Sequence, residues 1–215
     1  MCVFTDILKS EYPAAYGTTW KADYTVKAVM TSEPEFEIAD KKESIIQPAG
    51  QGVARFLNPN RKEIEVLDFE AFVDQFTQSV KAEQGKKCDF ILTDSRGEDV
   101  IVFNEISCLS SKSLQAFPQT EATDRGKIEK SFNQLRCSIE RVRKSAKLAE
   151  HIDGYRVKVG LFSYRLTDAV KENAATRAMQ DFNAPLMAQP VVRIKDALPG
   201  GFAYQRRAYP EGYEV

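Results

Sequence analysis

The chain has 215 residues, and its 30 Lys and Arg nearly balance 31 Asp and Glu, for a formal net charge of −1. Hydrophobic residues make up 43% and charged residues 28%, proportions typical of a folded globular protein and not of a disordered one. The length favours one substantial domain over two. Balanced charge excludes an overall basic field, so any affinity for nucleic acid needs a local patch.

The four cysteines, Cys2, Cys88, Cys108 and Cys137, are widely spaced, form no CxxC pair and are accompanied by a single histidine. This pattern argues against a zinc cage or a disulfide framework and favours reduced thiols in a cytoplasmic protein. The first twenty residues carry charges and no continuous apolar run, so we expect no secretory signal. No segment reaches the roughly 18 apolar residues of a spanning helix, so we expect no membrane association.

Residues 1–66 are predicted to form a β-rich N-terminal extension packed on the core, because ADYTVKAVM and EFEIADKKESIIQP favour strands while PAGQG and LNPN favour turns. The core and C-terminal elements then occupy residues 67–215. A helix over 68–82 opens this part, with Asp68 as its cap and Gly85 beyond its end. Its apolar face is formed by residues at helical spacing: Phe69, Phe72, Phe76 and Val80.

The sequence CDFILTDSRGEDVIVFNEISC predicts a β-hairpin, since two apolar runs at 88–93 and 100–108 flank the polar DSRGED. The Ser- and Gln-rich segment 109–124 predicts a loop.

One long helix is predicted over 125–150, capped by Asp124 and ended by Gly154. Its apolar stripe comprises Ile128, Phe132, Leu135, Ile139, Val142 and Ala146. A strand over 155–165, a helix over 168–182, and irregular or edge structure in the last thirty residues complete the prediction. The expected fold class is α/β, with a mixed central sheet flanked by helices.

Two carboxylates belong to the hairpin: Asp89 opens its first strand and Glu105 lies within its second. If the hairpin pairs them, their oxygens and the carbonyl of Ile106 can converge on a hard divalent cation, Mg²⁺ or Mn²⁺. Such an ion polarises a phosphodiester and lowers the pKa of an attacking water.

The succession of KKCDFIL, a turn, VIVFNEIS and a long helix with KSFNQL resembles the core of the PD-(D/E)xK phosphodiesterases, found in many restriction enzymes, resolvases and repair nucleases. The resemblance covers about residues 68–165. It implies a restriction-endonuclease-like core and metal-dependent hydrolysis of DNA or RNA, with Asp89 and Glu105 as catalytic, metal-holding acids. Ser107 occupies the catalytic position where the family has a lysine that orients or activates the water, and a neutral hydroxyl lacks that charge.

Some members of this family supply the missing cation from another element, and the helix offers candidates opposite its apolar stripe. We expect Lys130 to take the catalytic role. The resemblance also suggests Glu70, on the preceding helix, as a third metal ligand. Residues expected to contact nucleic acid are Lys112, Lys127, Gln134 and Arg141, together with Arg206 and Arg207, which lie between tyrosines as in many strand-binding surfaces.

Other interpretations stay open. Asp89 can be a strand-end acid that faces solvent, and Glu105 can be satisfied by a buried hydrogen bond or ion pair. The helix cations are also typical of a solvated amphipathic face. The leading function is a metal-dependent nuclease, with DNA placed ahead of RNA as the partner and a homodimer as one expected assembly. The alternative is a nuclease fold that has lost catalysis and binds nucleic acid or a partner protein, and a third is a structural or host-interaction protein.

Overall fold

A computed structural model describes residues 3–16, 24–39, 42–76, 86–109, 127–167 and 197–215. Among these residues a six-stranded sheet has the order β1-β5-β6-β7-β8-β9. The strands are β1 (Ala28–Thr31), β5 (Ile64–Asp68), β6 (Phe90–Asp94), β7 (Val100–Leu109), β8 (Val157–Leu166) and β9 (Ala203–Ala208). Neighbours from β1 to β7 are antiparallel, whereas β7, β8 and β9 are parallel. The predicted α/β class with a mixed central sheet is confirmed.

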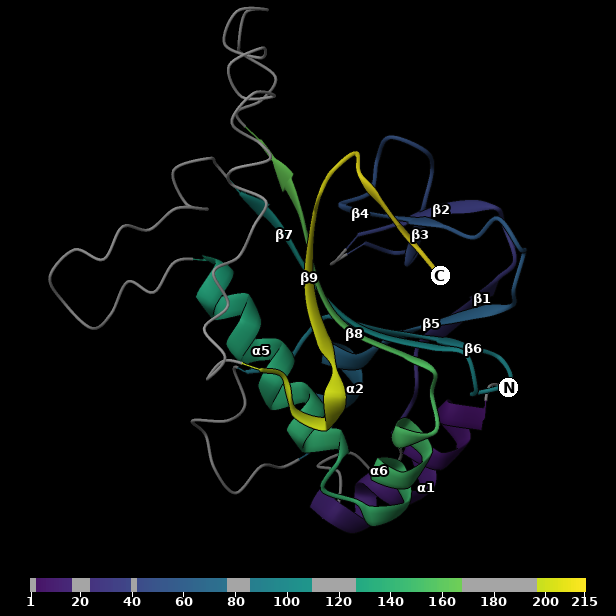
Figure 1. Ribbon diagram of the computed structural model, residues 1–215, viewed down its shortest axis with the longest axis vertical. Coiled ribbons are helices and arrows are strands. Elements are labelled where there is room, and N and C mark those ends of the chain that lie inside the picture. The colour runs from purple at the N-terminus through teal and green to yellow at the C-terminus, as the bar shows by residue number, and fades with distance from the viewer. Residues whose placement is uncertain (1–2, 17–23, 40–41, 77–85, 110–126, 168–196) are drawn as a thin grey trace, which may run out of the picture.

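A second sheet of four strands covers one face of the first. Its order is β10-β4-β2-β3, formed by Gly212–Glu214, Ala54–Leu57, Glu35–Ile38 and Ile46–Gln47. The opposite face carries the helices α1 (Val3–Tyr16), α2 (Phe69–Val73), α5 (Lys127–Val142) and α6 (Ala146–Asp153), and a short 3-10 turn, η3, spans Pro199–Gly201. Figure 1 shows the large sheet between the two layers, with the helices below it and the small sheet above. Within the described ranges, no helix is both long and apolar enough to cross a membrane.

The central strand β7 is buried on both sides because it separates two hydrophobic clusters. Ile101 and Phe103 point into the cluster under the helices, whereas Val100 and Val102 point into the cluster under the small sheet. Alternate residues of a strand face opposite sides, so an uninterrupted apolar run is what such a position requires. Both sheets combine strands from before and after residue 66, since β1 belongs to the large sheet with β6 to β9 and β10 pairs with β4 in the small sheet.

The N-terminal region contains the predicted strands and, in addition, a helix that was not predicted. In α1 the buried residues Phe4, Leu8 and Tyr12 recur every four positions, so they form one apolar stripe. The Tyr12 ring packs edge-on against Phe72 and Phe76. This spacing is a helix signal in the sequence, although Pro13 within the segment is unfavourable in a helix interior.

The prediction of one long helix over 125–150 was wrong, because α5 ends at Val142 and α6 begins at Ala146. Ser145 separates them in an extended conformation and caps α6, its side chain accepting a hydrogen bond from the Leu148 N–H. The predicted end at Gly154 is confirmed, as is the capping of α2 by Asp68. The predicted helix over 168–182, the loop from 110 to 124 with Asp124, and residues 77–82 lie outside the described residues.

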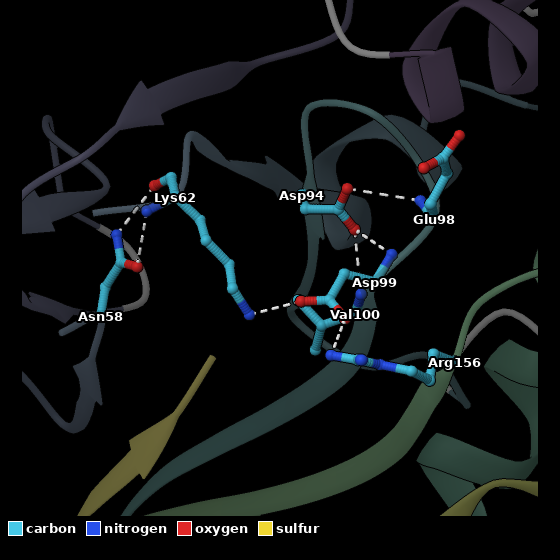
Figure 2. A network of polar contacts seen from close by, with 7 residues as sticks. All are labelled: Asn58, Lys62, Asp94, Glu98, Asp99, Val100 and Arg156. Atoms are coloured by element: carbon cyan, nitrogen blue, oxygen red, sulfur yellow. Dashed lines mark hydrogen bonds and ion pairs between the residues drawn. The ribbon is translucent and has the colours of Figure 1, made fainter. Parts of the chain in front are cut away.

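The predicted hairpin is confirmed, with β6 and β7 antiparallel. Its turn is organised by Asp94, whose carboxylate accepts hydrogen bonds from the backbone N–H groups of Glu98, Asp99 and Val100 (Figure 2). Ion pairs from Lys62 and Arg156 to Asp99 connect this turn to the neighbouring strands. These contacts fix one end of the hairpin, and with it the pairing of residues at the other end.

Candidate functional site

Asp89 and Glu105 lie opposite each other at the open end of the hairpin. Phe90 pairs with Asn104 in the antiparallel register, and continuing it by one residue brings Asp89 to Glu105. Directly opposed residues have Cβ atoms about 4.5–5.5 Å apart, and like charges at such positions repel. One contact offsets this repulsion: the backbone N–H of Ile106 donates a 2.7 Å hydrogen bond to Oδ2 of Asp89. The predicted pairing of the two acids is therefore what the strand register produces.

The segment before β6 is held between two helices. The N–H groups of Phe69 and Glu70, at the start of α2, donate to the Asp89 carbonyl at 2.9 and 3.2 Å. From α5, Gln134 Nε2 donates to the Lys87 carbonyl at 3.1 Å, and Ser138 Oγ accepts from the Cys88 N–H at 2.7 Å. Both helices are thereby positioned against the acid pair, with Glu70 on one side and Gln134 on the other.

Glu105 is buried with incomplete hydrogen bonding. Its exposed fraction is 8%, and within the described residues its Oε2 atom has no hydrogen-bond partner. Burial, followed by the negative charges of Asp89 and Glu70, raises the pKa of Glu105 to about 9. The positive charge of Lys130 and a hydrogen bond with Gln134 act in the opposite direction. Four other residues singled out from the sequence thus influence the pKa of Glu105: Asp89, Glu70, Lys130 and Gln134.

Lys87 is a buried cation at this site to which sequence reasoning assigned no role. Its side chain is 7% exposed, and its ammonium group forms ion pairs with Asp74 and, at 3.9 Å, with Glu70. The sequence signal for this role was the position of Lys87 two residues before Asp89, because alternate residues of an extended segment share a face. Lys87 therefore holds Glu70 beside the acid pair and partly offsets its charge.

Ser107 is half-buried and lies on the same face of β7 as Glu105, in register with Tyr164 of β8. The position at which the resembled family has a lysine is therefore on the face of Glu105, next to a tyrosine. Burial raises the pKa of Tyr164, whose phenol is neutral at physiological pH.

The other predicted contacts are distributed over different surfaces. Lys127 is the first residue of α5, three residues before Lys130 and hence on a neighbouring part of the helix surface. Arg141 lies about three turns beyond Lys130, is 5% exposed and packs near the Tyr16 ring of α1, away from Glu105. Lys112 lies outside the described residues. Arg206 and Arg207 are neighbours on β9, so their side chains face opposite sides of the sheet.

The donor chemistry of the site fits a hard divalent cation. Among the described residues no group of three or more His, Cys, Asp or Glu side chains is arranged to hold a metal. Asp89, Glu105 and Glu70 influence one another's charge without forming such a cage. Mg²⁺ keeps several waters and commonly takes only one or two carboxylates from a protein, and the opposed pair with the unpartnered Glu105 oxygen offers that number.

Comparison of the chain with protein-family models, with curated proteins and with solved structures finds no match. The resemblance to the PD-(D/E)xK phosphodiesterases therefore stays a prediction from the sequence, and the case for function depends on the site itself.

Proposed function

We propose that this protein is a divalent-cation-dependent nuclease with a restriction-endonuclease-like core, which hydrolyses phosphodiester bonds in DNA or RNA. The observation that carries the proposal is the opposed pair of Asp89 and Glu105, with the buried Glu105 Oε2 atom lacking a partner among the described residues. Glu105 lies in the second half of β7 and Asp89 immediately before β6, and from the neighbouring α5 Lys130 and Gln134 act on Glu105.

A purely structural role accounts poorly for this arrangement. Burying a carboxylate without full hydrogen bonding is costly, and placing a second carboxylate opposite it adds repulsion. An apolar or amide side chain at position 105 avoids both costs. A cation shared by the two acids removes the repulsion, so the arrangement makes physical sense as a binding site.

Each residue has a distinct role in the proposed site. Asp89, held by the Ile106 N–H, and Glu105 would hold Mg²⁺ or Mn²⁺, which when bound supplies charge stabilisation of the phosphodiester and a lower pKa for an attacking water. Gln134 orients Glu105 through their hydrogen bond. Lys130 provides the positive charge that Ser107 cannot, and it stabilises negative charge developing on the phosphate. Glu70, paired with Lys87, is available as a further acid.

A second candidate is a protein that binds nucleic acid or a partner protein without cleaving it. Ser107 favours this alternative, because the position that carries a lysine in the resembled family is neutral here. The two candidates differ in whether Lys130 has taken over the function of that lysine.

A cleavage assay distinguishes them. Labelled DNA and RNA, single- and double-stranded, are incubated with the wild type in Mg²⁺, in Mn²⁺ and in EDTA. We expect metal-dependent cleavage by the wild type and none by Glu105→Gln, which keeps the size of the side chain. Glu65→Gln is the matched control, since Glu65 is another buried sheet acid, accepts a hydrogen bond from Thr5 and lies on β5.

Loss of activity in Glu65→Gln as well would indicate a general effect on folding. Absence of cleavage by the wild type under every condition would contradict the nuclease proposal and leave the binding protein as the better account.

A further inference from the structure

A row of three residues crosses the parallel part of the sheet beside the proposed site. Glu105 of β7 pairs with Phe162 of β8, and Phe162 pairs with Arg206 of β9. Residues in register in a parallel sheet project from the same face. Neighbouring strands are about 4.8 Å apart, so the Cα atoms of Glu105 and Arg206 are separated by about 10 Å. Arg206 is therefore on the face of the acid pair, two strands away.

Contacts of β9 confirm which face this is. Tyr204, two residues before Arg206, packs its ring edge-on against Phe132 of α5, and its hydroxyl lies 3.3 Å from Ser131 Oγ. Burial raises the pKa of Tyr204, with a further increase from the charge of Glu105 and a decrease from that of Arg206. Tyr204 thus lies on the helix side of the sheet, on the same face of β9 as Arg206 and two residues before it.

Tyr164 of β8 completes the surroundings of Arg206. The positive charge of Arg206 lowers the pKa of Tyr164, although burial is the larger influence and raises it. Both phenols are neutral at physiological pH and can donate a hydrogen bond. A guanidinium with a tyrosine in the row on either side of it, on one face of the sheet, is a combination suited to a phosphate oxygen.

Arg207 provides the contrast, because it faces the other way. Its guanidinium donates to the Gln205 Oε1 atom at 3.0 Å and to the Arg206 carbonyl at 2.8 Å, and lies 5.8 Å from the centre of the Tyr213 ring. Tyr213 belongs to the cluster under the small sheet. The two adjacent arginines, equivalent in the sequence, therefore face different layers of the fold.

We propose that Arg206, with Tyr164 and Tyr204, binds a phosphate of the substrate strand other than the scissile one, so that the site selects a polynucleotide over an isolated phosphodiester. This inference rests on the proposed nuclease function. Each strand of a duplex carries one phosphate per about 3.4 Å of helix axis. The separation of about 10 Å between Glu105 and Arg206 therefore places the anchored phosphate within roughly three nucleotides of the reacting bond. The cation also offsets the repulsion between a polyanion and the acids at positions 70, 89 and 105.

The test compares Arg206→Gln with Arg207→Gln, the matched control on the same strand. Binding of a fluorescent oligonucleotide is measured by anisotropy at several salt concentrations, in EDTA and in Ca²⁺. Turnover of bis(p-nitrophenyl) phosphate, which has a single phosphate, is measured in Mn²⁺. We expect Arg206→Gln to weaken oligonucleotide binding about tenfold and to reduce the salt dependence by about one phosphate contact. We expect turnover of the small diester to be unchanged, and Arg207→Gln to resemble the wild type in both assays.

Equal weakening by the two variants, or no weakening by Arg206→Gln, would overturn the proposal. So would a matching loss of small-diester turnover in Arg206→Gln, because it would place the residue in the reaction itself. Arg206→Lys, which keeps the charge without the forked donor, is expected to bind between the wild type and the glutamine variant. If the wild type binds the oligonucleotide but cleaves nothing, the nuclease proposal fails while the binding comparison still decides the role of Arg206.

Discussion

The backbone N–H of Ile106 donates a 2.7 Å hydrogen bond to Oδ2 of Asp89, which fixes one carboxylate directly opposite the other acid of the hairpin. The contact uses backbone of the residue after Glu105, so the same strand that carries the second acid orients the first. The two acids are in this way kept adjacent in a buried site, where burial and the charge of Asp89 raise the pKa of Glu105.

In the absence of divalent metal, Glu105 is expected to destabilise the protein as the pH rises. Its pKa is raised from 4.5 to about 9 on folding, so the folded state keeps the proton after the unfolded state has lost it. The stability associated with this group is complete below pH 4.5 and is lost progressively up to about pH 9. A difference of one between the folded and unfolded pKa corresponds to about 1.4 kcal/mol.

Glu105→Gln removes this titration. In EDTA, thermal unfolding of the variant and the wild type between pH 5 and pH 9 should therefore show a difference that grows with pH in favour of the variant. A difference that does not change with pH would mean that Glu105 is ionised in the folded protein throughout this range.

Lys130→Met should reduce the rate of cleavage without comparable loss of substrate binding. Lys130 acts on Glu105 electrostatically, so its loss removes positive charge from the reacting centre. We expect kcat to fall at least about a hundredfold, in the range found for removing one group that stabilises transition-state charge. Lys127→Met, on the same helix, should raise KM and leave kcat unchanged. Equal effects of the two substitutions on kcat would show that α5 contributes only general charge.

Introducing at position 107 the lysine of the family that the sequence resembles provides a gain-of-function test. Ser107 lies on the face of Glu105 and is half-buried, so a lysine there can direct its ammonium group toward the acids. In a Lys130→Met background, Ser107→Lys should recover part of the lost kcat, whereas Ser107→Met should not. Lack of recovery, with the fold intact by circular dichroism, would contradict the assignment of position 107 to the lysine site.

Lys87→Met should strengthen divalent-cation binding while lowering stability. The substitution removes a buried positive charge near the acids and releases Glu70 and Asp74 from their ion pairs. Because those carboxylates are partly exposed, the loss of stability should be about 1 kcal/mol or less. Metal affinity, measured by calorimetry, should rise several-fold as repulsion of the incoming cation decreases.

Lys62→Met is the matched control for this change. Lys62 pairs with Asp99 at the far end of the hairpin (Figure 2), so its removal should lower stability without altering metal affinity. An equal change in metal affinity for both variants, or weaker binding in Lys87→Met, would contradict the proposed role of Lys87.

The hairpin and its acids could be predicted because local patterns determine them. Two apolar runs around DSRGED imply strand pairing, and that pairing brings together residues sixteen positions apart, Asp89 and Glu105. The break between α5 and α6 was missed because the apolar stripe was followed only as far as Ala146, whereas the buried residues of α6, Leu148 and Ile152, fall on the opposite side of a continuous helix. That change in the phase of the apolar residues, together with Ser145 as a cap, was the sequence signal for a second helix.

The remaining parts of the site depend on contacts between distant elements, which a single sequence does not contain. Lys87 takes part in the site because α2 packs beside it and brings Glu70 into contact. Arg141 is buried because α1 packs against it. Arg206 and Arg207 can be told apart only once the neighbours of β9 are known. The sequence therefore predicted which types of residue are near the site, and the order of the strands determines which of those residues face it.

The most direct test of the central claim is a calorimetric titration of Mg²⁺ and Mn²⁺ into the wild type, Glu105→Gln and Glu65→Gln. Binding to the wild type and to Glu65→Gln, with loss of binding in Glu105→Gln, is the predicted result. Absence of binding to the wild type, or binding that persists unchanged in Glu105→Gln, would contradict a cation site at Asp89 and Glu105.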